Sequence, residues 1–151
     1  MRRSDKEITN QELIDHIIRN SLVCRLAMVD GDEPYIVPVS FGITGSTIYF
    51  HSSLQGRKTD ILRKNPKICF EFESDVEIIS NELACKWSFN YRSIIGSGIA
   101  EIITNTEEKT NVMKVIMKQY SDKEFSIPID SIQKTMVVKI AIISISAKQS
   151  G

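Results

Sequence analysis

The sequence offers few of the residues that build metal centres or disulfide frameworks. Its three cysteines, Cys24, Cys69 and Cys85, are odd in number and widely spaced, which favours reduced thiols in the cytoplasm over paired ones. It has no C-x-x-C and no H-x-x-x-H pair, and its two histidines, His16 and His51, lie far apart. We therefore expect no metal site, and we expect the cysteines to fill core positions.

Long hydrophobic runs and an excess of one charge are also missing. The most apolar stretch, 136–147, is short and contains Lys139, whereas a membrane-spanning helix needs about 20 apolar residues. The N-terminus is not followed by the apolar segment of a secretory signal. Lysine plus arginine and aspartate plus glutamate both number 19, and nucleic-acid binders need net or clustered positive charge. We expect a cytoplasmic protein that binds neither membranes nor nucleic acids.

What the sequence does contain is the composition of one globular domain. Its 151 residues are 42% hydrophobic and 25% charged, which is typical of folded proteins and not of disordered ones. A chain of this length can bury about 69% of its unfolded surface. We therefore expect residues 1–151 to form a single domain with its own core.

Three helices are predicted from capping signals and hydrophobic periodicity. Capping boxes at Thr9–Glu12 and Thr104–Glu107, in which the threonine hydroxyl accepts from an early backbone N–H, predict helices over 11–20 and 107–120. A shorter helix is predicted over 58–64, because the proline that follows it disfavours helical backbone.

Six strands joined by short connections account for most of the remaining chain. Gly96 and Gly98 indicate a bulge or a close approach of two backbones within one strand. Segments 74–90 and 122–131 are predicted to be irregular. The strands, which are apolar or alternate with period two, are predicted over 22–29, 35–41, 47–51, 67–73, 93–103 and 136–146. Local connections without a β-α-β rhythm predict a mainly β fold with peripheral helices, namely a six-stranded antiparallel barrel, closed or partly closed.

The clearest candidate for a binding site is the segment that leads into the short helix. Ser52 and Ser53 supply hydroxyl donors, and Gly56 lets the backbone come close to a ligand. Arg57 can hold two phosphate oxygens in its fork, and Lys58 adds a point charge. Because a helix start also offers free N–H groups, the pattern suits a phosphomonoester. A solvated basic helix start is the alternative.

Two further segments have chemical potential. Trp87, Tyr91, Arg92 and Ser93 either line a pocket for a flat ligand or cover one end of the barrel. Pro38 lies within a predicted strand and cannot donate to a ladder, which indicates an edge strand, a bulge or a strand that faces a ligand. His51 ends a strand directly before the candidate phosphate site, where it can serve as a proton donor or as a structural residue.

Taken together, these segments resemble the FMN-binding split barrels of the pyridoxamine-phosphate-oxidase-like superfamily, and within it the 5-nitroimidazole-resistance (Nim-type) branch. Each segment is a weak signal alone, and their order and spacing are specific. The resemblance extends over nearly the whole chain and is carried by residues 23–29, 34–41, 49–52, 56–58, 65–66, 85, 87, 91–93, 96 and 98.

The resemblance implies an FMN site with contributions from two subunits. In similar proteins the strand corresponding to Pro38, Val39, Ser40 and Phe41 lies along the flavin ring, largely through its backbone. The pair His51-Ser52 lies at the ring or ribityl edge, and Arg57-Lys58, next to Gly56, grips the phosphate. Arg92-Ser93 reaches the flavin from the other subunit of a homodimer, which implies two sites at the interface.

The resemblance also implies a function. We expect an FMN-dependent oxidoreductase that reduces small electron-poor molecules, such as nitroaromatic compounds, with NADH or NADPH as donor and His51 as a candidate proton donor. A flavin-binding or electron-relay protein without turnover is an alternative, as is a barrel that binds haem or a deazaflavin. Pyridoxamine-phosphate oxidation is not expected, because the C-terminal residues 143–151 lack the tryptophan and the arginine or histidine of those enzymes.

Overall fold

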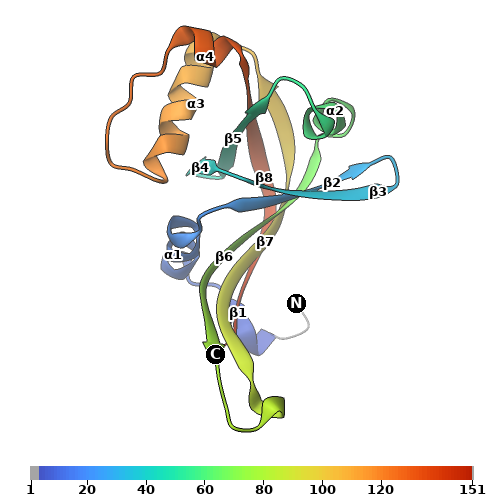
Figure 1. The fold of residues 1–151 in the computed structure, drawn as a ribbon, viewed down its shortest axis with the longest axis vertical. Helices are drawn as coiled ribbons and strands as arrows, with labels where there is room; N and C mark the ends of the chain where they lie inside the picture. Colours follow the sequence, from blue (N-terminus) through green and yellow to red (C-terminus); the bar gives the residue numbers. More distant parts are fainter. Residues whose placement is uncertain (1–3, 151) are drawn as a thin grey trace.

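The computed structural model describes residues 4–150 and contains one antiparallel sheet with helices around it (Figure 1). The sheet order is β3-β2-β6-β7-β8-β5-β4, and β1 pairs with β8. The strands are β1 (Glu7–Ile8), β2 (Cys24–Asp30), β3 (Glu33–Val39), β4 (Phe41–Thr44), β5 (Thr47–Ser53), β6 (Lys67–Ile79), β7 (Ser88–Ile103) and β8 (Thr135–Ser150). The predicted mainly β barrel with flanking helices is confirmed, although the sheet of the described residues has eight strands and not six.

Four α-helices and two short 3₁₀ turns, Ser4–Lys6 and Ala84–Lys86, complete the described chain. None of the helices within residues 4–150 is long and apolar enough to cross a membrane. The predicted loop over 122–131 is confirmed for residues 122–128, and a short helix begins at Ile129. The helices are α1 (Gln11–Asn20), α2 (Arg57–Lys64), α3 (Thr106–Lys118) and α4 (Ile129–Gln133).

The two predicted capping boxes were one residue too early. Asn10 and Asn105 are the N-caps of α1 and α3, and their side chains accept the backbone N–H groups of Leu13 (3.2 Å) and Glu108 (2.9 Å). Asparagine is at least as good an N-cap as threonine. Asn10 is therefore the N-cap in place of Thr9, and Asn105 in place of Thr104.

The core lies inside the barrel, where period-two alternation places large apolar side chains. Phe41, Phe50, Phe70 and Phe72 are fully buried there. A second cluster of Ile103, Val112, Ile116 and Val137 fixes α3 on the outer side of β5, β7 and β8.

The predicted strand over 35–41 is two strands that separate at Ser40. β3 is the edge strand that pairs with β2, and β4 pairs with β5. Pro38 therefore lies in an edge strand, where a missing N–H is tolerated. Where the strands separate, the Tyr120 hydroxyl accepts the Phe41 backbone N–H (2.9 Å) and donates to the Leu22 carbonyl (3.1 Å).

The segment predicted to be irregular, 74–90, instead extends β6 and β7 into a long hairpin that projects from the barrel (Figure 1). We call residues 75–91 the arm. The pairing of β6 with β7 shifts between Ser74 and Glu77, and Asp75 there has a φ of 55°. Left-handed backbone is uncommon for a residue other than glycine, so this position marks a sharp local bend at the base of the arm.

The predictions for the strand glycines and the cysteines had different outcomes. A Cβ on Gly96 would lie 2.3 Å from Phe70 Cζ, and the pairing with β8 shifts next to Gly98, so close approach and bulge are both confirmed. Only Cys24 is a core residue, and burial raises the pKa of its thiol to about 12. Cys69 and Cys85 are exposed, because Cys69 faces outward on β6 and Cys85 lies in the 3₁₀ turn of the projecting arm. The prediction that they fill the core was wrong.

Candidate functional site

The start of α2 is held open by the loop that precedes it. Gly56 is the N-cap residue, with a φ of 122°, and no side chain caps the first turn of the helix. The Thr59 hydroxyl donates to the Ser53 carbonyl (3.0 Å), and the Gln55 N–H donates to the Ser53 hydroxyl (3.3 Å). These bonds fix the loop without using the first backbone N–H groups of the helix. The helix start therefore offers free N–H donors and a positive dipole end to an anion.

The two cations of α2 flank this start and have different surroundings. The Arg57 Nε donates to the Asp30 carboxylate (3.0 Å), and its guanidinium lies 4.8 Å from the centre of the Tyr35 ring. Lys58 is half-buried, with its amine 5.7 Å from the centre of the Phe50 ring. Among residues 4–150, no carboxylate lies within salt-bridge distance of that amine. Burial lowers the pKa of Lys58.

His51 stands beside Lys58 at the end of β5. Its Nε2 lies 3.4 Å from the Ser40 hydroxyl. Burial, and then the charge of Lys58, lower the pKa of His51 below its ordinary value. The imidazole is therefore neutral at neutral pH, and its two nitrogens offer one donor and one acceptor. The neighbouring Ser52 is half-buried.

The segment 38–41 presents alternate residues to the outside. Pro38 and Ser40 are exposed, whereas Val39 and Phe41 point into the core. The Phe41 N–H is already donated to Tyr120. A ligand on this face would meet the side chains of Pro38 and Ser40 and only the backbone of Val39.

The structure does not bring Trp87, Arg92 and Ser93 to this site within one chain. His51 pairs with Val137 on β8, whereas Arg92 pairs with Gln149, which comes twelve residues later on the same strand. That separation is roughly 40 Å of strand. Figure 1 shows the arm at one end of the molecule and α2 near the other. The Trp87 Nε1 donates to the Asn81 carbonyl (2.7 Å), and its ring is 55% exposed.

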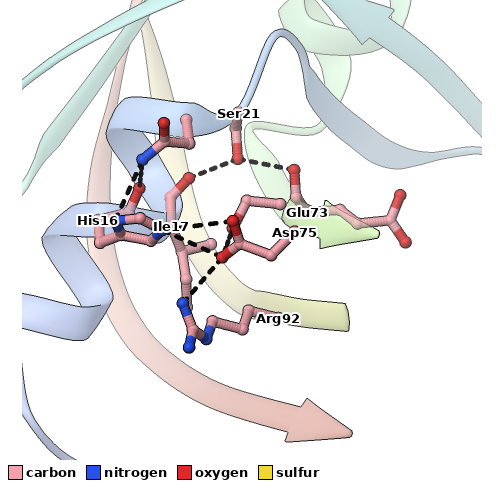
Figure 2. A network of polar contacts seen from close by, with 8 residues as sticks. His16, Ile17, Ser21, Glu73, Asp75 and Arg92 are labelled. Carbon is pink, nitrogen blue, oxygen red and sulfur yellow. Dashed lines mark hydrogen bonds and ion pairs between the residues drawn. The ribbon is translucent and has the colours of Figure 1, made fainter. Parts of the chain in front are cut away.

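Arg92 belongs to a polar network at the base of the arm (Figure 2). The Asp75 carboxylate accepts from Arg92 Nη1 (3.0 Å), His16 Nε2 (3.1 Å) and the Ser74 hydroxyl (3.1 Å). Burial acts to raise the pKa of Asp75, but the hydrogen bonds from Ser74 and His16 and the charges of His16 and Arg92 outweigh it and lower that pKa. The network fixes Arg92 relative to α1 and β6.

Sequence reasoning missed four residues that hold the predicted ones in place: Asp30, Tyr35, Tyr120 and Asp75. Each acts on a partner that is distant in sequence, such as Asp30 on Arg57. Asp30-Gly31 is a typical hairpin-turn sequence, but nothing in the sequence pairs that hairpin with α2. Single-residue contacts across a barrel leave no periodic signal to find.

Comparison with known proteins agrees with this architecture. Residues 10–149 match the protein family described as pyridoxamine 5'-phosphate oxidase. The chain belongs to this family. Its FMN-binding split-barrel branch is the one that the sequence resembles, and the match over most of the chain confirms that resemblance.

Several solved structures share the family fold. A proposed 5-nitroimidazole antibiotic resistance protein from Bacteroides thetaiotaomicron VPI-5482 is 27% identical, with a TM-score of 0.85 over 95% of this chain and 86% of that chain. The flavocytochrome Anf3 from Azotobacter vinelandii is 20% identical, with a TM-score of 0.84 over 100% of this chain and 72% of that chain. The FAD- and haem-binding protein from Mycobacterium smegmatis is 20% identical, with a TM-score of 0.82 over 96% of this chain and 73% of that chain.

A relative in Rhizobium meliloti (strain 1021), the protein RA0666, is 31% identical over 64 residues. The match spans 42% of this chain and 42% of that protein, so less than half of the relative is represented here.

Proposed function

We propose that the chain binds FMN and works as an oxidoreductase on small electron-poor molecules, such as nitroaromatic compounds. The observation that carries this proposal is the half-buried Lys58 amine, which has no carboxylate partner within the described residues and stands beside an uncapped helix start. A cation in that position is stabilised by a bound anion. The solved relatives that bind flavin, among them the FAD- and haem-binding protein, support a flavin as the source of that anion.

In this proposal the phosphate lies at the start of α2. The first N–H groups of the helix, the terminal N–H groups of Arg57 and the amine of Lys58 would donate to it, and Ser52 and Ser53 precede them in the chain. Around Gly56 no atom lies within 4 Å of where a Cβ would be, so the approach is open. Charge-assisted hydrogen bonds of this kind are each worth about 1.5–3 kcal/mol.

The residues that would hold the flavin ring are exposed Pro38 and Ser40 and the backbone of Val39. A flavin held there would supply the redox chemistry between NADH or NADPH and the substrate. The neutral His51 holds a proton next to that face. With the proton on Nδ1, its Nε2 accepts from the Ser40 hydroxyl and the Nδ1–H is left for a ligand. We propose His51 as the proton donor to the substrate: the Nδ1 proton passes to the substrate as Nε2 takes up the proton of the Ser40 hydroxyl, which exposed Ser40 recovers from water.

We also propose that the protein is a homodimer in which the arm of one subunit completes the site of the other. A two-stranded hairpin is marginally stable alone, and this arm carries large apolar side chains that are more than half exposed: Val76, Ile78, Leu83, Trp87 and Phe89. An exposed apolar surface of this kind indicates a partner. Packing against a second copy would carry Arg92 and Ser93 toward the site that the single chain leaves open.

The test is the absorbance spectrum of the purified protein, followed by release of the bound pigment and sedimentation analysis. The expected result is a flavin spectrum, about one FMN per chain, a dimer, and reduction of a nitroaromatic compound with NADPH. A colourless protein that takes up no added FMN would refute the proposal. A haem or deazaflavin spectrum would show that the chain binds that cofactor in place of FMN. FMN binding without turnover would show a protein that binds flavin but does not act as an oxidoreductase.

A further inference from the structure

Arg57 is held on two sides by residues that the proposed site does not otherwise use. Asp30, the last residue of β2, accepts the Arg57 Nε–H at 3.0 Å. Tyr35, on β3, makes a cation–π contact with the guanidinium, with 4.8 Å between the ring centre and Cζ. Both residues come from the β2–β3 hairpin, which packs beside α2 (Figure 1).

These two contacts determine which donors of Arg57 remain available. A guanidinium has five N–H donors in one plane. The Asp30 carboxylate occupies the Nε–H, and the Tyr35 ring lies within cation–π distance of the guanidinium. The four donors on the two terminal nitrogens are the ones suited to two oxygens of a phosphate. Because the Arg57 side chain is 50% exposed, it would otherwise sample many rotamers.

We propose that Asp30 and Tyr35 are positioning residues that orient Arg57 for the phosphate of the flavin. The inference rests on the proposed function and adds two residues to it. The two residues differ in how they affect the affinity for phosphate. Tyr35 is uncharged and only orders the arginine, whereas Asp30 orders it and also repels a phosphate dianion. The hairpin therefore sets both the geometry and the upper limit of phosphate affinity.

The first experiment replaces Tyr35 and compares FMN with riboflavin, which lacks the phosphate. Tyr35→Leu is expected to weaken FMN binding roughly three- to tenfold. Without the tyrosine, the Arg57 side chain would lose its conformational entropy only on binding, and a loss of that size corresponds to this change in affinity. Riboflavin affinity is expected to stay unchanged. Tyr35→Phe keeps the ring and is expected to bind both ligands like the wild type. Unchanged FMN affinity in Tyr35→Leu, or equal losses for both ligands, would overturn the proposal.

The second experiment replaces Asp30 by asparagine, whose amide oxygen still accepts the Nε–H but carries no charge. FMN binding is expected to tighten about two- to fivefold at low salt, and the gain should fade as salt is added. Asp32→Asn removes the same charge from the exposed turn of the same hairpin and should give a smaller gain. Weaker FMN binding by Asp30→Asn, or equal gains from both variants, would contradict the role of Asp30.

A third measurement separates this inference from the proposed function, because it needs no ligand. In the ligand-free protein, ¹⁵N relaxation of the Arg57 Nε should show an ordered side chain, and Tyr35→Leu should increase its motion. An Arg57 Nε as mobile in the wild type as in Tyr35→Leu would overturn the positioning role even if FMN binds. An ordered Arg57 in a protein that fails to bind FMN would instead refute only the proposed function.

Discussion

Replacing Lys58 by methionine should change stability and flavin affinity in opposite directions. The methionine side chain is apolar and unbranched like the lysine stem, and it would place no charge near the Phe50 ring. The substitution removes a half-buried charge that, within residues 4–150, has no carboxylate partner. In the ligand-free protein that charge opposes folding, because burial lowers the pKa of Lys58 below that of the unfolded chain.

The sign of the pH dependence follows from that shift. Below the folded-state pKa the lysine is charged in both states, and the full cost of burying the charge is present. As the pH rises through the folded-state pKa toward the ordinary lysine value, the folded protein releases the proton first, and the cost disappears. Ligand-free Lys58→Met should therefore be more stable than the wild type at neutral pH, and its advantage should shrink in alkaline solution.

Flavin affinity should move the other way. Losing one charge-assisted hydrogen bond to phosphate costs about 1.5–3 kcal/mol, or roughly 10- to 150-fold in Kd. Titration calorimetry with FMN and riboflavin, together with thermal unfolding of the ligand-free protein, measures both effects. Lys64→Met, exposed at the other end of α2, is the control and should leave FMN affinity unchanged. Wild-type FMN affinity in Lys58→Met, or an equal loss for riboflavin, would refute the phosphate assignment.

Three further predictions follow from other parts of the structure. Gly96→Ala puts a Cβ 2.3 Å from Phe70 Cζ and should lower the unfolding free energy by about 1–3 kcal/mol or more, and wild-type stability in urea would contradict it. Asp75, whose folded-state pKa is lowered, contributes stability that is lost as the pH falls through that pKa. Asp75→Asn should therefore be less stable at neutral pH by about 1 kcal/mol, with no difference in acid. Because the charge of Lys58 helps to lower the pKa of His51, Lys58→Met should raise that pKa in an NMR titration, and an unchanged titration would disprove their coupling.

The barrel could be predicted because its interior imposes a regular pattern. Phe70 and Phe72 alternate with outward residues, and only a strand with one buried face requires that alternation. The arm follows no such rule, since nearly all of its side chains are exposed in the single chain. The bend at Asp75, with its φ of 55°, also has no sequence signal, because left-handed backbone at an aspartate depends on its tertiary contacts.

The local part of the candidate site was also predictable, and its long-range part was not. Gly56, Arg57 and Lys58 follow one another in sequence, so the helix start that they form could be read from the chain. The contact between His51 and Ser40 depends on the split between β3 and β4. The tyrosine hydroxyl that holds this split open belongs to Tyr120, 79 residues after the Phe41 N–H that it accepts. A bond over that separation comes from the packing of α3 and not from a local pattern.

The different surroundings of the two cations indicate how the site divides its work. The charge of Arg57 is already balanced by Asp30, so its contribution to anion binding is mainly the geometry of its remaining donors. Lys58 has no such counter-ion within the described chain, so under the proposed function a phosphate would gain most of its electrostatic attraction there. That attraction is available because folding leaves a half-buried amine without a counter-ion, at some cost to the stability of the ligand-free protein. A site arranged in this way would favour the anion-bound state, because the ligand-free state is destabilised by the unpaired charge. The same charge contributes to the lowered pKa of His51.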